Sequence, residues 1–169
     1  MAKMADKYSQ RLSINLAQAA ANTTILSEIL SGVPIFEKMA FIIHRFECTP
    51  NKSVFPLMTV AEDYIACGLT NSSTLTDVDY EDMEMICRAE WMAGSSAQPP
   101  SATNPLPYVF DFTGLPQGGI LVPPKPLYWF VASAGLASVC QFGMRAYFTM
   151  RTLTTTEYWE LVESIRGIV

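Results

Sequence analysis

Few residues of this sequence have the side chains and the spacing that catalysis needs. The chain has one histidine, His44, so a pair of histidines that binds a metal is excluded. Regular strand alternation places His44 on the same face as four apolar residues: Ala40, Ile42, Phe46 and Cys48. We therefore expect a partly buried, hydrogen-bonded histidine, and we predict no catalytic residue and no enzyme.

A second candidate site is acidic. Asp77, Asp79 and Glu81 have the spacing with which a calcium-binding loop begins, but Asp82 and Arg88 stand where an EF-hand needs glycine and glutamate. We expect a solvated acidic loop, whose carboxylates could also face a lysine or arginine of a neighbouring subunit. A calcium ion held between subunits stays open as an alternative, and we expect no other cofactor.

The four cysteines are Cys48, Cys67, Cys87 and Cys140. They have no Cys-x-x-Cys spacing and no neighbouring histidine, so no metal site is expected. Each stands in an apolar stretch, which predicts reduced thiols in the core. The glycines between 114 and 119 lack the lysine and the following helix of a phosphate-binding loop, and they predict turns.

The composition narrows the function further. Of the 169 residues, 50% are hydrophobic and only 16% are charged, and the formal net charge is −5. With so few charges to cover a lone monomer, we expect part of the surface to face a partner. The acidic balance argues against nucleic-acid binding driven by overall charge. Lys3, Lys7 and Arg11 make only a weak basic arm at the N-terminus.

Most of the chain alternates between apolar and polar residues, which predicts β-strands. The strand candidates are 11–16, 36–48, 57–69, 84–91, 108–112, a short segment at 120–122, 127–132 and 138–153. Residues 24–31 fit either a short strand or a helical turn. The stretch 92–107, rich in Gly, Ser, Ala and Pro, predicts a long surface loop.

The run 126–144 carries no charge and is long enough for a membrane-spanning helix. It also contains serines and glycines, and it divides naturally at 133–136. We therefore expect two buried strands around a turn, and we keep a membrane helix as an alternative.

Near the C-terminus the spacing of the apolar residues changes from that of a strand to that of a helix. Thr154 and Glu157 have the spacing of a capping box. An apolar stripe of helical spacing follows, formed by Tyr158, Leu161, Val162 and Ile165. Gly167 then ends the predicted helix.

These elements predict an all-β fold, a single jelly-roll sandwich of about eight antiparallel strands with a short C-terminal helix. The chain divides into an N-terminal arm at 1–10, the sandwich at 11–153 and the helix at 154–167. A cupin-like enzyme barrel is disfavoured because such a barrel usually binds its metal with two or three histidines, and this chain has one.

Four segments resemble the single jelly-roll capsid proteins of small icosahedral viruses. They are the strand Phe41–Glu47, the late pair Pro126–Leu136 and Met144–Met150, and the start of the helix, Thr156–Val162. The resemblance is one of pattern and implies a structural protein whose copies form a closed icosahedral shell around a genome. It implies a virion component that is assembled inside the host cell, with other capsid proteins as further candidate partners. Many relatives have an arginine-rich arm, which is absent here, so genome contact is expected to be weak or indirect.

We expect three contact regions between subunits. The first is the helix, through Tyr158, Trp159, Leu161 and Val162, and the second is the loop 92–107. The third is the acidic group Asp77, Asp79, Glu81 and Asp82. The alternative function is a ligand- or receptor-binding jelly-roll module that forms a small discrete oligomer. We predict no small-molecule substrate.

Overall fold

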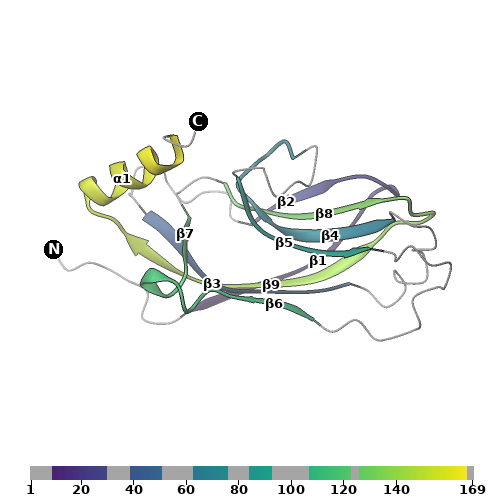
Figure 1. Cartoon of the computed structure of the whole chain (residues 1–169), viewed down its shortest axis with the longest axis horizontal. Helices are drawn as coiled ribbons and strands as arrows, with labels where there is room; N and C mark the ends of the chain where they lie inside the picture. The colour runs from purple at the N-terminus through teal and green to yellow at the C-terminus, as the bar shows by residue number, and fades with distance from the viewer. Residues whose placement is uncertain are drawn as a thin grey trace.

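The computed structural model describes residues 9–29, 39–50, 63–75, 84–92, 107–122 and 126–166 (Figure 1). The early strands are β1 (Gln10–Ala17), β2 (Ile25–Glu28), β3 (Met39–Pro50), β4 (Tyr64–Thr70) and β5 (Met85–Met92). They are followed by β6 (Tyr108–Asp111), the 3-10 turn η3 (Pro116–Gly118), β7 (Ile120–Val122), β8 (Tyr128–Ala134), β9 (Gln141–Thr152) and the helix α1 (Thr155–Arg166).

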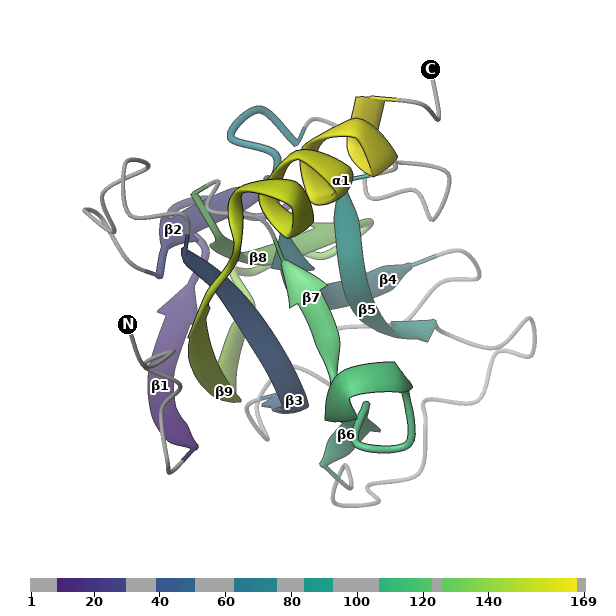
Figure 2. The ribbon, with the colours of Figure 1, turned by 90° about the vertical axis from the view of Figure 1, so that its left-hand side faces the viewer.

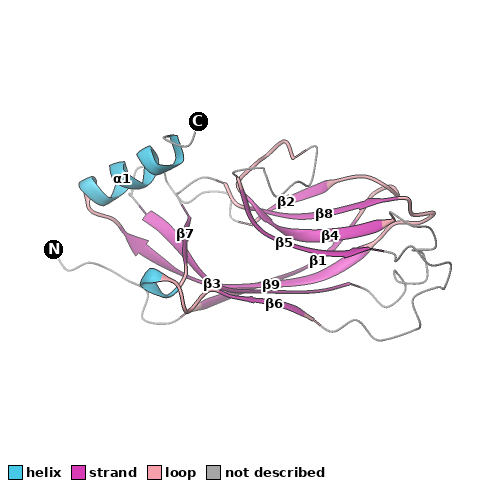
Figure 3. Ribbon diagram, in the orientation of Figure 1, coloured by secondary structure: helices cyan, strands magenta, loops and turns pink. Residues whose placement is uncertain are grey.

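The strands form two antiparallel sheets that pack face to face (Figure 3). Sheet A has the order β1-β9-β3-β6, and β7 also pairs with β3. Sheet B has the order β2-β8-β4-β5. Since β6 and β7 pair with consecutive parts of β3, at 45–48 and 41–43, they act as one interrupted strand.

The path of the chain between the sheets identifies the fold. It crosses from one sheet to the other after β1, β2, β3, β5, β7 and β8. Two four-stranded antiparallel sheets joined in this way form a jelly roll. The prediction of an all-β jelly-roll sandwich with a short C-terminal helix is confirmed.

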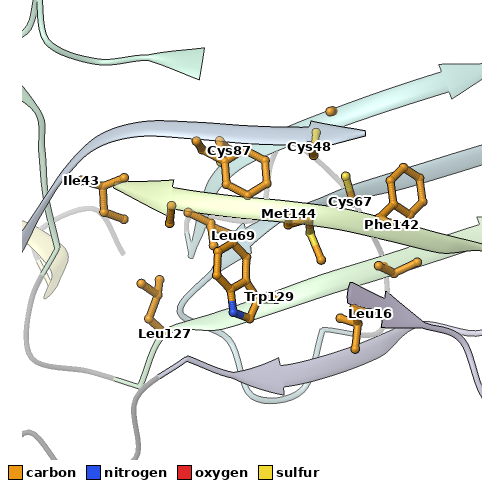
Figure 4. Packing of buried hydrophobic residues seen from close by; sticks show 14 of the residues in the cluster. Leu16, Ile43, Cys48, Cys67, Leu69, Cys87, Leu127, Trp129, Phe142 and Met144 are labelled. Carbon is orange, nitrogen blue, oxygen red and sulfur yellow. The ribbon is translucent and has the colours of Figure 1, made fainter. Parts of the chain in front are cut away.

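Alternation along the strands builds the core between the two sheets. In β9 the inward side chains are buried, and the outward ones face solvent or the neighbouring strands. The inward set is Phe142, Met144, Ala146 and Phe148. Trp129 of sheet B lies among these residues (Figure 4) and its ring centroid is 6.0 Å from that of Phe46 in sheet A. Each large side chain buried in this way stabilises the fold by about 2 kcal/mol.

The phase of alternation inside β3 differs from the prediction. Its pairing with β9 slips between Ile43 and Arg45, which makes His44 the extra residue of a β-bulge. The core residues on the two sides of the bulge are Phe41, Ile43, Phe46 and Cys48. The prediction that His44 shares a face with Phe46 and Cys48 is therefore wrong, because the bulge shifts the alternation by one residue.

The uncharged run 126–144 forms two strands, as expected. β8 and β9 are joined by a turn at Gly135, whose φ of +77° suits a residue without a Cβ atom. Among the described residues, no helix has the length and the apolar character that crossing a bilayer requires.

Two side-chain amides, of the buried Gln18 and the exposed Asn22, fasten this turn to the segment after β1. The Gln18 side chain accepts hydrogen bonds from the Ser133 hydroxyl and the Cys140 N–H, both at 3.0 Å. Asn22 donates to the Leu136 carbonyl at 2.9 Å and accepts from the Leu136 N–H at 2.7 Å. The ends of β1, β8 and β9 are thus held together by side-chain hydrogen bonds.

Helix α1 begins with the predicted capping box. The Thr154 N–H donates to Glu157 Oε2 at 2.8 Å, and the Glu157 N–H donates to Thr154 Oγ1 at 3.3 Å. The helix lies beyond one end of the sandwich, across the ends of β3, β7 and β9 (Figure 2). The division into an arm, a sandwich and a helix stays a prediction, since residues 1–8 lie outside the described residues.

Candidate functional site

Helix α1 presents a large aromatic side chain to solvent. Trp159 is 55% exposed, and its ring makes an edge contact with Tyr158 at 5.9 Å between centroids. Tyr158 and Leu161 are half-buried, and Glu160 is exposed. The side chain of Val162, the fourth residue expected in a helix contact, lies outside the described part. An exposed tryptophan on a terminal helix is typical of a surface that becomes buried on association.

The start of α1 is tied to the end of β9 in sheet A. Arg151 of β9 donates to Glu157 Oε1 at 2.7 Å and to Gln117 Oε1 at 3.0 Å. Because Gln117 belongs to η3, this arginine joins a strand, a turn and the helix. The orientation of Trp159 therefore depends on contacts within the chain that fix where the helix begins.

A second exposed surface lies where the two sheets end on the same side. β5 and β6 are edge strands of sheets B and A, and among the described strands each has only one neighbouring strand (Figure 2). Trp91 and Tyr108 connect them, with ring centroids 5.6 Å apart. Tyr108 is 47% exposed, and Val109 and Met92 are also exposed. Unpaired edges that carry apolar side chains are templates for pairing with another chain.

The opposite end of the sandwich also exposes an apolar residue. Val139 stands in the β8–β9 connection, at the end away from α1 (Figure 1), and is 47% exposed. Exposed apolar groups thus occur at both ends of the sandwich and along one side. A protein that makes a single paired contact needs one such surface, whereas a tiling protein needs several.

His44 has a structural role on the outer face of sheet A. Its Nδ1 lies 2.7 Å from the Gly118 carbonyl oxygen, which can only accept, so Nδ1 carries the proton. Its Nε2 lies 2.9 Å from Thr149 Oγ1. Both ring nitrogens therefore have partners, which fixes η3 against β3 and β9. The expectation of a partly buried, hydrogen-bonded histidine is confirmed.

The four cysteines are free and buried, as predicted. Burial raises the pKa of the Cys87 thiol well above its ordinary value, and that of Cys140 to about 11. Burial and the adjacent Cys48 also raise the pKa of Cys67. Thiols in this state are poor nucleophiles, so the four cysteines pack as small apolar residues. Figure 4 shows three of them, Cys48, Cys67 and Cys87.

A polar groove of about 530 Å³ crosses the outer face of sheet A. Strand register brings its lining together in rows: Ser13 and Glu47 flank Arg145, and Asn15 and Thr49 flank Gly143. A Cβ atom added to Gly143 would lie 3.2 Å from Asn15 Oδ1, so the glycine keeps the floor of the groove open. Arg11 stands at one end, diagonally opposite Arg145.

The sequence alone does not predict this groove. Its residues come from three segments, 11–15, 47–49 and 143–145, which only the strand register joins. The one signal in the sequence is the outward row of polar residues in β1 and β9, together with a glycine inside the regular alternation of β9.

Two of the predicted contact regions lie outside the described residues. These are the acidic group Asp77, Asp79, Glu81 and Asp82, and nearly all of the loop 92–107. Within the described ranges, no cluster of histidine, cysteine and acidic side chains has the arrangement of a metal site. The acidic contact and the calcium alternative stay predictions.

Comparison with known proteins gives similarity at the level of structure. No family model matches the sequence, and no curated protein matches it. The chain is similar to a chain in the crystal structure of tomato aspermy virus, with a TM-score of 0.40 and 11% identity over 86% of this chain and 79% of that one. It is also similar to VP1 of human polyomavirus 6, determined as a pentamer, with a TM-score of 0.39 and 10% identity over 91% and 99%. These structural neighbours are viral capsid proteins.

Proposed function

We propose that this protein is a structural capsid protein whose copies assemble into a closed icosahedral shell around a viral genome. Its role is geometric and not enzymatic, and it needs no cofactor. Its place is the virion, assembled in the interior of the host cell. Its main partners are further copies of itself, other capsid proteins could share the shell, and contact with the genome is weak or indirect.

One observation carries this proposal: apolar side chains are exposed on separate parts of the sandwich. Trp159 lies at one end, Val139 at the other, and Tyr108 and Val109 on the side between them. Each copy therefore has surfaces for neighbours in several directions. Closed shells need contacts in several directions, whereas a two-fold dimer buries one self-complementary surface.

The helix is the first contact to test. We include Tyr158, Trp159, Leu161 and Val162 in it, and we include the loop 92–107 as a second contact. The acidic residues form a third contact that pairs with basic residues of a neighbour, and this contact should weaken as salt rises. They are Asp77, Asp79, Glu81 and Asp82.

Light scattering coupled to size-exclusion chromatography, with electron micrographs of the leading peak, tests assembly. The unaltered chain should form closed particles of megadalton mass. Trp159→Ala should give small species, because loss of a central tryptophan costs about 2 kcal/mol or more at each contact. Glu160→Ala, a neighbouring exposed position, is the control and should assemble normally. Thermal unfolding should be unchanged in both variants, since Trp159 is largely exposed already.

A stable monomer or trimer of the unaltered chain at every salt concentration and pH would contradict unaided assembly. The discrete ligand- or receptor-binding module would then be the better reading. If Trp159→Ala still forms particles, the proposal of a shell stands, but the helix is not one of the contacts that hold it together.

A further inference from the structure

The groove on the outer face of sheet A concentrates positive charge in an acidic chain. Arg11 and Arg145 both line it, and they stand at diagonal positions on neighbouring strands. Diagonal pairs are within reach of one another for side chains as long as arginine. Two guanidinium groups can therefore approach one oxyanion from two sides, and guanidinium groups bind carboxylates through paired hydrogen bonds.

Most of this charge is available to a ligand. No acidic side chain of the described part pairs with Arg11. Glu47 lies 2.7 Å from Arg45 Nη2 but 3.9 Å from Arg145 Nη1, so its closer partner is the arginine outside the groove. Arg145 is also 57% exposed. Its charge is thus only partly compensated within the chain.

Neutral polar groups surround the two arginines. The side chains of Ser13, Asn15 and Thr49 line the groove and form none of the hydrogen bonds found among the described residues. Together they supply two hydroxyl groups and an amide, and Glu47 adds an acceptor. A groove of about 530 Å³ has the size of a small-ligand site and is too large for a single small ion.

We propose that this groove binds an acidic saccharide, with the carboxylate between Arg11 and Arg145 and the sugar hydroxyl groups on Ser13, Asn15, Thr49 and Glu47. Glu47 accepts hydrogen bonds from hydroxyl donors and stands on β3, on the other side of β9 from Arg11. A ligand with one carboxylate can keep that charge away from Glu47, whereas a phosphodiester chain carries a charge on every unit. Among the described residues, the lining contains no aromatic ring on which a base could stack. A saccharide therefore fits this lining better than a nucleic acid. The proposal goes beyond shell assembly and does not depend on it.

Saturation-transfer difference NMR on the full chain tests the proposal, because it works for a free chain and for a large particle alike. Glucuronate and glucose form the matched probe pair, since they differ in a carboxylate that replaces a hydroxymethyl group. Glucuronate should bind, and glucose should bind about tenfold more weakly or not at all, because a hydrogen bond to a charged group is lost.

Three variants in the groove and one control locate the site. Arg11→Gln and Arg145→Gln should each weaken glucuronate binding by about tenfold. Arg151→Gln removes the same charge from the same face of sheet A, six residues along β9 from Arg145 and outside the groove, so it is the control and should change binding by less than about twofold. Gly143→Val should abolish binding without a change of charge, since it fills the floor beneath Asn15.

Several results would overturn the proposal. Equal binding of glucose and glucuronate, or equal loss in Arg151→Gln and Arg11→Gln, would show that the arginines do not hold a carboxylate in the groove. Inorganic phosphate that competes as well as glucuronate would show an oxyanion site without sugar recognition. Stronger binding of an oligothymidylate would show a nucleic-acid surface. Trp159→Ala should retain glucuronate binding, which separates failure of this site from failure of assembly.

Discussion

Gln18 shows how one side chain can hold the end of this sandwich together. It is 5% exposed, its amide nitrogen donates to the Thr23 carbonyl, and its oxygen accepts from Ser133 and from Cys140. These partners belong to the segments before β2, at the end of β8 and before β9. The amide thus satisfies buried groups from three places that are far apart in the sequence.

Gln18→Ala should lower the free energy of unfolding by about 2–3 kcal/mol, because it leaves a buried hydroxyl and a buried N–H without their acceptor. Urea unfolding followed by tryptophan fluorescence measures the change. Gln10→Ala, at the exposed start of β1, is the matched control and should change stability by less than about 0.5 kcal/mol. Equal effects of the two substitutions would contradict the role given to Gln18.

Among the elements, α1 has the most local determinants. The capping box at Thr154 and Glu157 satisfies two N–H groups at the helix start, and Arg151 fixes Glu157 from β9. Thr154→Ala should therefore destabilise the helix by about 1 kcal/mol. Since α1 lies beyond the sandwich, the strands should be unaffected.

Hydrogen exchange measures this effect element by element. Exchange of α1 amides should accelerate about fivefold in Thr154→Ala, while amides of β4 and β8 keep their protection. Thr156→Ala, inside the first turn and exposed, is the control and should leave exchange nearly unchanged. Faster exchange throughout the sandwich would show that the helix stabilises the whole fold.

The elements also show which features a sequence can reveal. Alternation predicts β1, β5 and β9 because each has one polar and one apolar face, and the capping box predicts where α1 begins. The bulge at His44 is hidden because residues 39–43 are apolar on both faces, so no phase can be assigned there. The groove is hidden for another reason: Ser13, Glu47 and Arg145 become neighbours only through the register of three strands.

At the scale of the whole molecule, the net charge conceals an uneven distribution. Although the chain carries −5 overall, the outer face of sheet A presents Arg11, Arg45, Arg145 and Arg151. Exposed apolar residues occur elsewhere, at the two ends and on the side of β5 and β6. Apolar association and anion binding therefore use different parts of the sandwich, so both proposals can hold for one molecule.

The buried thiols make the stability of the whole sandwich sensitive to alkaline pH. An ordinary thiol has a pKa near 9.0, and burial raises the pKa of Cys87 and Cys67 in the folded chain. Above about pH 9 the unfolded chain therefore loses protons that the folded chain retains, and unfolding becomes more favourable as pH rises. Below that pH both states hold the protons and the full stability is present.

Urea unfolding between about pH 8 and pH 10.5 measures this loss, which should approach 1.4 kcal/mol per pH unit for each thiol that ionises only on unfolding. Cys87→Ala lowers the stability at every pH by creating a small cavity. It should also reduce the fall of the unfolding free energy with pH by up to about 1.4 kcal/mol per pH unit, the contribution of one proton. The dependence of the unfolding free energy on pH thus reports on the Cys87 thiol even though the substitution lowers the stability itself. If this dependence is the same with and without Cys87, ionisation of other groups governs alkaline unfolding, and the thiol is not held protonated in the folded core.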